Sequence, residues 1–177
     1  ADPTETVKAI FEATKYDQSV YIRLTGGANT SQIYKSDYEF KIGKAIQLLD
    51  GEDVLIIACG SIVKTAIDCA EYLKNKNISC EVLNMHTIKP IDKKQIKKSI
   101  SKKKLIVTIE EHNIIGGLGS AVSEVISEID NSPKKISFGI DDKYSKGGSY
   151  SFLKNKFGID ANKITDKIIK ELNYEKI

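Results

Sequence analysis

Residue types that can do chemistry gather behind one apolar stretch of the chain. The run LIVTI (105–109) is followed by the polar run EEHN (110–113), and then by Gly116, Gly117 and Gly119. Carboxylates and an imidazole can transfer protons, and backbone N–H groups at the start of a helix can bind an anion. The spacing GGxG is shorter than the full GxGxxG fingerprint. Two interpretations therefore stay open: a ligand-binding turn, or a tight turn that only permits close packing.

The elements on both sides of this turn are predicted by their apolar pattern. LIVTI alternates and is rich in β-branched residues, which favours a buried strand. After the turn, one helical stripe is formed by Leu118, Ala121, Val122, Val125, Ile126 and Ile129. The carboxyl end of a strand thus meets the amino end of a helix, which is where ligands tend to bind in open α/β sheets.

A second histidine follows another predicted strand. His86 comes after the apolar run of residues 79–85, as His112 comes after LIVTI. Two histidines at one edge of a sheet could serve acid–base catalysis. No serine, cysteine or carboxylate joins them in a nucleophile motif, and two histidines alone do not define a metal site. The sequence therefore assigns no catalytic residue and no metal site.

Several linked motifs carry a family resemblance that covers nearly all of the chain. VTIEEHNIIGGLGSAVSEV (107–125) resembles the turn in the C-terminal domain of the transketolase family, whose members are thiamine-diphosphate enzymes. The family includes transketolases, 1-deoxyxylulose-5-phosphate synthases and the β subunits of 2-oxoacid dehydrogenases. GEDVLIIACGSIVKTAIDCAEYL (51–73), VLNMHTIKPID (82–92) and residues 138–164 resemble the neighbouring parts of that domain.

The start of the chain resembles the end of a different domain. ADPTETVKAIFEA (1–13) and VYIRLTGG (20–27) are similar to the last helix and strand of the preceding pyrimidine-binding domain. A helix and a single strand cannot form a core of their own. The resemblance thus implies that residues 1–30 are a remnant of that domain. Residues 31–177 would form the C-terminal domain, a three-layer α/β/α fold with a five-stranded, mostly parallel sheet and one antiparallel strand within residues 38–49.

The resemblance also implies what this piece lacks. In the family, the glutamate that contacts the cofactor and the magnesium site of the diphosphate lie N-terminal to this region. We therefore expect no cofactor and no catalytic residue in this chain, and no activity of the fragment by itself. Thiamine diphosphate and Mg²⁺ would be bound by missing N-terminal domains or a separate subunit. Because family members are usually dimers, a homodimer is also expected.

The candidates for substrate or anion binding are few. Arg23 in YIRLTGG matches the first arginine of the family's RxxR pattern, which in several members helps to hold a sugar phosphate, but the second position is Gly26. This departure leaves room for a substrate without that phosphate, or for an anion held by Thr25 and backbone amides. Arg23 could equally pair with a surface carboxylate. The candidates are Arg23, Thr25, His112, Gly116 and Gly117.

Composition excludes several classes of function. The 177 residues carry a net charge of only +3, and the lysine-rich run at 93–104 contains no arginine or aromatic residue, so nucleic-acid binding is not expected. No apolar run approaches the roughly 20 residues of a membrane span, and no signal peptide is recognisable. The three cysteines form no CxxC pair and read as reduced core thiols. The cytoplasm is the default location.

The remaining elements are predicted in chain order. Asp2 caps a helix that starts at Pro3, and its apolar face is Val7, Ile10 and Phe11. Strands are expected at 19–24, 53–59, 79–85 and 135–140, with residues 37–49 forming a hairpin with 53–59. Helices are expected from Gly60 to about residue 75, from Asp92 to about residue 100, and after Asp160, with one helical turn at 151–157. The apolar residues of 1–30 should be covered by a second copy or by the glycine-turn edge.

Three functional hypotheses follow. The chain is the C-terminal domain of a transketolase-like enzyme and is catalytic only within the full assembly. Alternatively, it is a free-standing α/β module whose glycine turn binds an anion or nucleotide, or it is a purely structural dimerisation domain. A start at a helix without an initiator methionine suggests a domain cut from something longer.

Overall fold

A five-stranded mixed sheet forms the centre of the protein. The computed structural model describes residues 1–25 and 31–174, except for the side chains of Asn173 and Tyr174. The strand order is β1-β3-β2-β4-β5, in which β1 is antiparallel to β3 and the other neighbours are parallel. The fold class implied by the resemblance is confirmed. The strands are β1 (Ile46–Leu49), β2 (Val54–Ala58), β3 (Cys80–Asn84), β4 (Leu105–Asn113) and β5 (Lys134–Ile140).

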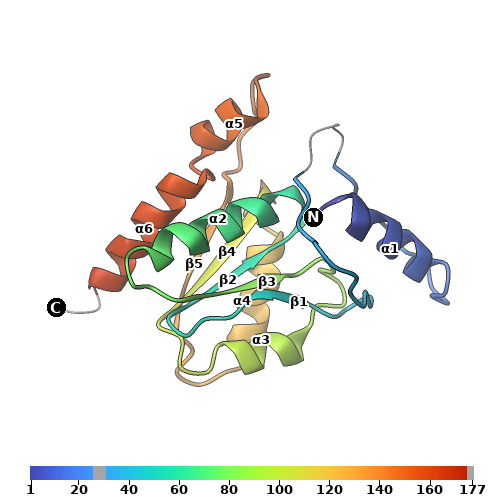
Figure 1. Cartoon of the computed structure of the whole chain (residues 1–177), viewed down its shortest axis with the longest axis horizontal. Helices are drawn as coiled ribbons and strands as arrows, with labels where there is room; N and C mark the ends of the chain where they lie inside the picture. The colour runs from blue at the N-terminus through green and yellow to red at the C-terminus, as the bar shows by residue number, and fades with distance from the viewer. Residues whose placement is uncertain (26–30, 175–177) are drawn as a thin grey trace.

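Helices cover both faces of this sheet. Figure 1 shows α2 and α6 on one face and α3 and α4 on the other, which gives three layers. Both α1 and α5 extend beyond the side where the parallel strands end (Figure 1). The helices are α1 (Pro3–Ala13), the short 3₁₀ helix η1 (Gly60–Ile62), α2 (Val63–Lys74), α3 (Lys93–Ser99), α4 (Leu118–Ile126), α5 (Tyr150–Phe157) and α6 (Ala161–Tyr174).

The apolar runs of the sequence correspond to strands that are buried on both faces. In β2, Val54, Ile56 and Ala58 pack toward α2 and α6, whereas Leu55 and Ile57 pack toward α3 and α4. All five residues of β2 are fully buried. A strand between two layers needs apolar residues on both of its faces, which is why its sequence does not alternate with polar residues.

The predicted hairpin between residues 37–49 and 53–59 is wrong. β2 lies at the centre of the sheet, where both of its edges pair with parallel strands, β3 and β4. β2 therefore has no free edge for an antiparallel neighbour. The preceding strand β1 pairs instead with β3, with Ile46 opposite Asn84. The antiparallel strand implied by the resemblance is present, but only over Ile46–Leu49.

Two other local predictions need correction. Residues 19–24 form no strand, because this largely exposed segment pairs with no strand of the sheet in the described part of the chain. The expected single turn at 151–157 is an eight-residue helix, α5, in which Ser149 accepts a hydrogen bond from the N–H of Phe152 and Gly158 ends the helix at φ +68°. The caps Asp2 and Asp92 are confirmed, since each accepts a backbone N–H three residues later.

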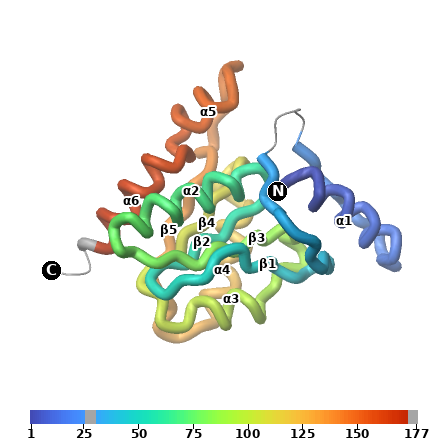
Figure 2. Tube along the Cα trace, viewed as in Figure 1, coloured from blue at the N-terminus to red at the C-terminus, as the bar shows by residue number. Residues whose placement is uncertain are grey.

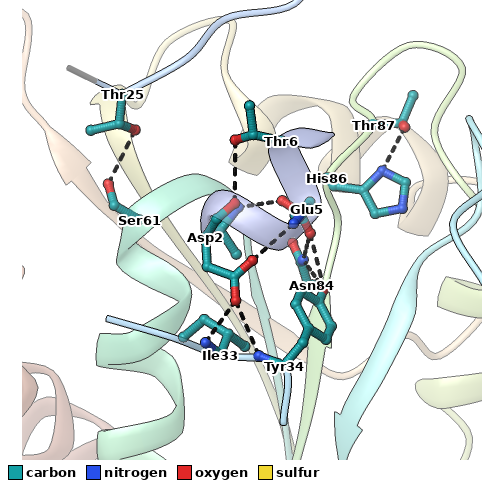
Figure 3. A network of polar contacts seen from close by, with 11 residues as sticks. Asp2, Glu5, Thr6, Thr25, Ile33, Tyr34, Ser61, Asn84, His86 and Thr87 are labelled. Carbon is teal, nitrogen blue, oxygen red and sulfur yellow. Dashed lines mark hydrogen bonds and ion pairs between the residues drawn. The ribbon is translucent and has the colours of Figure 1, made fainter. Parts of the chain in front are cut away.

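The amino end of α1 is fixed to the sheet by a buried polar network, drawn in Figure 3. Asp2 accepts hydrogen bonds from the N–H groups of Ile33 (2.8 Å) and Tyr34 (3.1 Å). Glu5 accepts one from the hydroxyl of Tyr34 (2.9 Å) and a further one from the side-chain amide of Asn84, at the carboxyl end of β3. In Figure 2, residues 31–45 pass the amino end of α1 before they reach β1. α1 therefore docks beside β3 rather than on the glycine turn.

The rest of α1 is not covered. Val7, Ile10 and Phe11, its predicted apolar face, are all exposed, as are Val20 and Leu24 in the segment that follows.

Within the described residues, no helix is both long enough and apolar enough to span a membrane.

Candidate functional site

The glycine turn is built around a buried carboxylate. Glu110 is 1% exposed, although it lies near the end of β4. Its two oxygens accept hydrogen bonds from the N–H groups of Leu118 (2.7 Å) and Gly119 (2.8 Å) at the start of α4. These N–H groups lack partners within the helix, and a negative charge at a helix amino end is stabilised by the helix dipole. The protein's own carboxylate therefore occupies the position that an external anion would take.

Three glycines make room for this carboxylate. A Cβ at Gly117 would lie 1.9 Å from Oε2 of Glu110, and one at Gly119 would lie 3.3 Å from Oε1 and 2.8 Å from Oγ of Ser137. A Cβ at Gly139, on β5, would lie 3.1 Å from Cγ of Glu110 and 2.7 Å from Cγ2 of Ile114. Gly116 differs, because it has φ +78° and open space around it. The turn needs Gly117 for close approach and Gly116 for its backbone conformation.

A second polar group lies where the sheet reverses its strand order. β2 has β3 on one side and β4 on the other, so the residues that follow β2 and β4 flank the crevice where ligands bind in such sheets. Here Glu111 accepts hydrogen bonds from Oγ of Ser61 (2.7 Å) and from the hydroxyl of Tyr150 in α5. Burial and the hydrogen bond to Glu111 raise the pKa of Tyr150. Tyr150 therefore acts as a neutral donor that ties α5 to β4.

The predicted site residues are only partly brought together. Thr25 lies with its Oγ1 3.5 Å from Oγ of Ser61, next to the Glu111 group, and Arg23 is exposed. Gly26, the departure from the RxxR pattern, lies outside the described residues. His112 is exposed on the glycine turn, where its Nδ1 is 3.0 Å from the backbone oxygen of Asn113. The turn thus carries His112, Gly116 and Gly117.

The two histidines do not form a common catalytic pair. His86 follows β3 and His112 lies in β4, with β2 between them, and two strand spacings amount to about 10 Å. His86 stacks on Phe40 with ring centroids 4.0 Å apart, and its Nδ1 is 2.8 Å from Oγ1 of Thr87. Its Nε2 is buried and has no hydrogen-bond partner among the residues that the structure describes. His86 is a packed residue of the β3 end.

The buried position of His86 predicts an acid-sensitive term in stability. Burial lowers the pKa of His86, and the nearby Glu5 carboxylate only partly opposes this shift. The unfolded state then binds the proton more readily, so stability falls as the pH drops below about 6.5, the ordinary pKa of histidine. In His86→Phe, the free energy of unfolding should decline less between about pH 7 and pH 5.5. Urea denaturation at several pH values measures both slopes, and equal slopes would contradict the prediction.

Sequence reasoning missed three residues of this region. In the sequence, Glu110 stands out only as part of a polar run. Its place shortly before the glycines and the helix is nevertheless a signal for a carboxylate that caps this helix. Ser61 and Tyr150 were not singled out, because 50 and 39 residues separate them from Glu111. Among the described residues, no three His, Cys, Asp or Glu side chains are grouped so that they could hold a metal ion.

Comparisons with known proteins identify the family. The family model described as "Transketolase, C-terminal domain" matches residues 43–164. A protein of Methanocaldococcus jannaschii that is called a transketolase C-terminal section is 40% identical over 176 residues, which are 98% of this chain and 54% of the relative. The 6-deoxy-6-sulfo-D-fructose transketolase subunit SqwH of Clostridium sp. MSTE9 is 38% identical over 92% of this chain and 50% of its own length.

A solved structure supports the same family assignment as these two relatives. It is described as a split gene transketolase, inactive β4 tetramer, and it superimposes with a TM-score of 0.90 at 32% identity. The superposition covers 98% of this chain and 56% of that one. The chain thus spans about half the length of these relatives. The fold, the glycine turn and the match over residues 43–164 together show that the chain belongs to the transketolase C-terminal domain family.

Proposed function

We propose that the chain is the C-terminal part of a transketolase-like enzyme that transfers a two-carbon unit between sugars or 2-oxo acids. In this proposal it is inactive alone and acts together with the missing N-terminal domains or subunit, termed the N-terminal half, which bind thiamine diphosphate. The names of the relatives support this view, since one is called a C-terminal section, one a subunit and one a split gene product. The role of this part is structural or regulatory, with assembly as a dimer expected by analogy.

The observation that carries the proposal is the internal cap of α4. A free-standing anion-binding module would offer the N–H groups of Leu118 and Gly119 to its ligand, but here Glu110 accepts both. Binding a phosphate there would place it against a buried carboxylate of the same sign. This arrangement favours a turn that holds the domain together over a turn that binds a nucleotide.

The residues present do not fit thiamine diphosphate. The N–H groups at the start of α4 are the ones that could bind a diphosphate, but they already donate to Glu110. The described residues also offer no cluster of His, Cys, Asp or Glu side chains that could hold Mg²⁺. The cofactor and its metal ion are therefore assigned to the N-terminal half, and no catalytic step is assigned to this chain.

We further propose that residues 1–30 belong to the preceding domain of the parent enzyme. The apolar face of α1 is exposed, and residues 19–24 are largely exposed and join no strand in the described part of the chain. Both features are expected of a helix and an edge segment that complete a neighbouring sheet. The boundary itself lies outside the described residues.

Arg23 and Thr25 remain the candidates for contact with a substrate. Thr25 lies beside Ser61, and Arg23 is exposed on the same segment, so both could face a ligand bound to the N-terminal half. The absence of a second arginine at Gly26 is compatible with a substrate without a terminal phosphate. One relative is named for 6-deoxy-6-sulfo-D-fructose, a sugar with a sulfonate in place of the terminal phosphate.

Calorimetric titration tests this division of labour. Thiamine diphosphate with Mg²⁺ should give no binding signal with the isolated chain, because the groups that would hold the ring and the metal ion are not in it. The N-terminal half, produced as a separate polypeptide, should bind the cofactor when mixed with this chain. A saturable micromolar signal from the chain alone would overturn the proposal.

A further inference from the structure

Exposed large apolar side chains are concentrated at one end of the molecule. Among the described residues, thirteen such side chains are exposed. Only Tyr72, on α2, lies away from the carboxyl end of the sheet and the N-terminal segment docked there. Of the others, seven are carried by α1 and residues 16–24, Ile88 lies in the segment after β3, and four form a second set on the C-terminal domain itself. This second set comprises Ile115 on the glycine turn together with Tyr144, Tyr150 and Phe152 in and before α5.

The segments that carry the second set are fastened to each other. The side-chain amide of Asn113 donates to Oδ1 of Asp142 (2.9 Å), and the N–H of Ile114 donates to the backbone oxygen of Ile140 (3.0 Å). Ile114 also packs into the space left by Gly139. The glycine turn and the start of the 141–149 stretch are therefore held side by side.

Two further contacts hold α5 in place. Tyr150 donates to Glu111 at the end of β4, and Nζ of Lys154 is 3.4 Å from Oγ1 of Thr65 on α2. The same ammonium lies 4.7 Å from the centre of the Tyr150 ring. Ile115 is nevertheless 69% exposed and Phe152 is 55% exposed. Apolar side chains that are held in place but not covered are typical of a binding surface, because binding then costs little conformational entropy.

We infer that Ile115, Tyr144, Tyr150 and Phe152 form a docking surface for the thiamine-diphosphate-binding N-terminal half, an inference that rests on the proposed function. This chain covers about half of relatives that are themselves called a C-terminal section, a subunit or a split gene product, and 26% of a 1-deoxy-D-xylulose-5-phosphate synthase, so most of such an enzyme lies outside this chain. In Figure 1 the amino terminus lies on the side of the molecule from which α1 and α5 extend. An N-terminal half attached or docked there would meet α1 first and the α5 surface next to it. The glycine turn then serves protein contact through Ile115 rather than ligand binding.

Single substitutions can test this surface in the full chain. Ile115→Ser and Phe152→Ser remove apolar area without touching either core cluster, and Tyr72→Ser removes a comparable side chain, 48% exposed, outside the proposed surface. Sedimentation velocity with the separately produced N-terminal half measures each affinity. We expect Ile115→Ser and Phe152→Ser to weaken association at least about tenfold, as for central interface residues, and Tyr72→Ser to change it less than about twofold.

The outcomes separate this inference from the proposed function. If the wild-type chain does not associate with the N-terminal half at all, the proposed function fails and this surface fails with it. If the wild-type chain associates and both variants bind equally well, only the docking surface is wrong. If the variants change self-association of the chain alone but not binding to the N-terminal half, the surface is a contact between copies and the inference is overturned. Unchanged thermal midpoints of the variants confirm that they are folded.

Discussion

Gly117→Val should lower the free energy of unfolding by about 3 kcal/mol or more. A Cβ at this position would lie 1.9 Å from Oε2 and 2.7 Å from Cδ of Glu110, and 2.8 Å from the backbone oxygen of Asn113. The carboxylate cannot keep its hydrogen bonds to Leu118 and Gly119 and also avoid the new side chain. Breaking the pairing of a buried charge typically costs 3–5 kcal/mol. Urea denaturation followed by circular dichroism measures the loss.

The chain offers a matched control for this substitution. Gly147 is exposed, and a Cβ there would have no heavy atom within 4 Å, so Gly147→Val should change stability by less than about 0.5 kcal/mol. Glu110→Ala should cost stability as well, because it leaves two N–H groups of α4 without their acceptor. In the double variant the two losses should not add, since the clash and the cap involve the same carboxylate. Additive losses, or a stable Gly117→Val protein, would show that Glu110 does not hold the turn.

Glu5→Ala should cost about 2–3 kcal/mol and release α1 from the sheet. Glu5 accepts hydrogen bonds from the Tyr34 hydroxyl and the Asn84 amide, and both donors are buried. Removing the acceptor leaves the Tyr34 hydroxyl without its acceptor, and the Asn84 amide keeps only its bond to that hydroxyl (2.6 Å). An unsatisfied buried donor costs about 1–3 kcal/mol, and the total loss cannot exceed the free energy of undocking α1. Glu12→Ala is the control on the same helix, because within the described residues the Glu12 side chain makes one ion pair, with the exposed Lys15. Hydrogen exchange should show loss of protection in α1 for Glu5→Ala alone, and protection equal to that of Glu12→Ala would contradict this account.

The rest of the domain should fold without the segment that α1 belongs to. A chain that starts at Lys35 keeps the buried members of both core clusters, and from the removed part only the partly buried Ala1 and Ile33 pack against them. We expect one cooperative unfolding transition, at a lower midpoint than that of the full chain. Thermal unfolding measures this directly. A shortened chain that is unfolded would show that residues 1–34 are part of the core rather than a remnant of a neighbouring domain.

The elements that could be predicted from the sequence are those whose signal is local. The apolar run of β2 and the capping residues Asp2 and Asp92 act within a few positions, and they led to the right elements. The partner of β1 could not be read in this way. The turn after β1 is compatible with a hairpin, but both edges of β2 pair with strands that come later in the chain, β3 and β4. Competition between distant segments decided the pairing.

The site shows the same limit. The glycines and the polar run marked the correct turn, because the sequence places them next to each other. What fills the turn depends on the direction of one side chain, since Glu110 points into the helix start whereas Glu111 accepts from Ser61 and Tyr150. Adjacent residues on a strand face opposite sides, but which of the two is buried depends on the packing of β5 and α4. Only the assembled structure shows that the anion position is occupied from within.

The most direct test of the central claim is an assay of two-carbon transfer with the chain, the N-terminal half and their mixture. Each is incubated with thiamine diphosphate, Mg²⁺, a ketose donor and an aldose acceptor. The two products are then measured: the aldose left when the donor loses two carbons, and the ketose formed when the acceptor gains them. The account predicts that the mixture is active and that the chain alone is not. Activity of the chain alone, or a mixture that forms no complex and no product, would contradict the assignment of this chain as the C-terminal part of a transketolase-like enzyme.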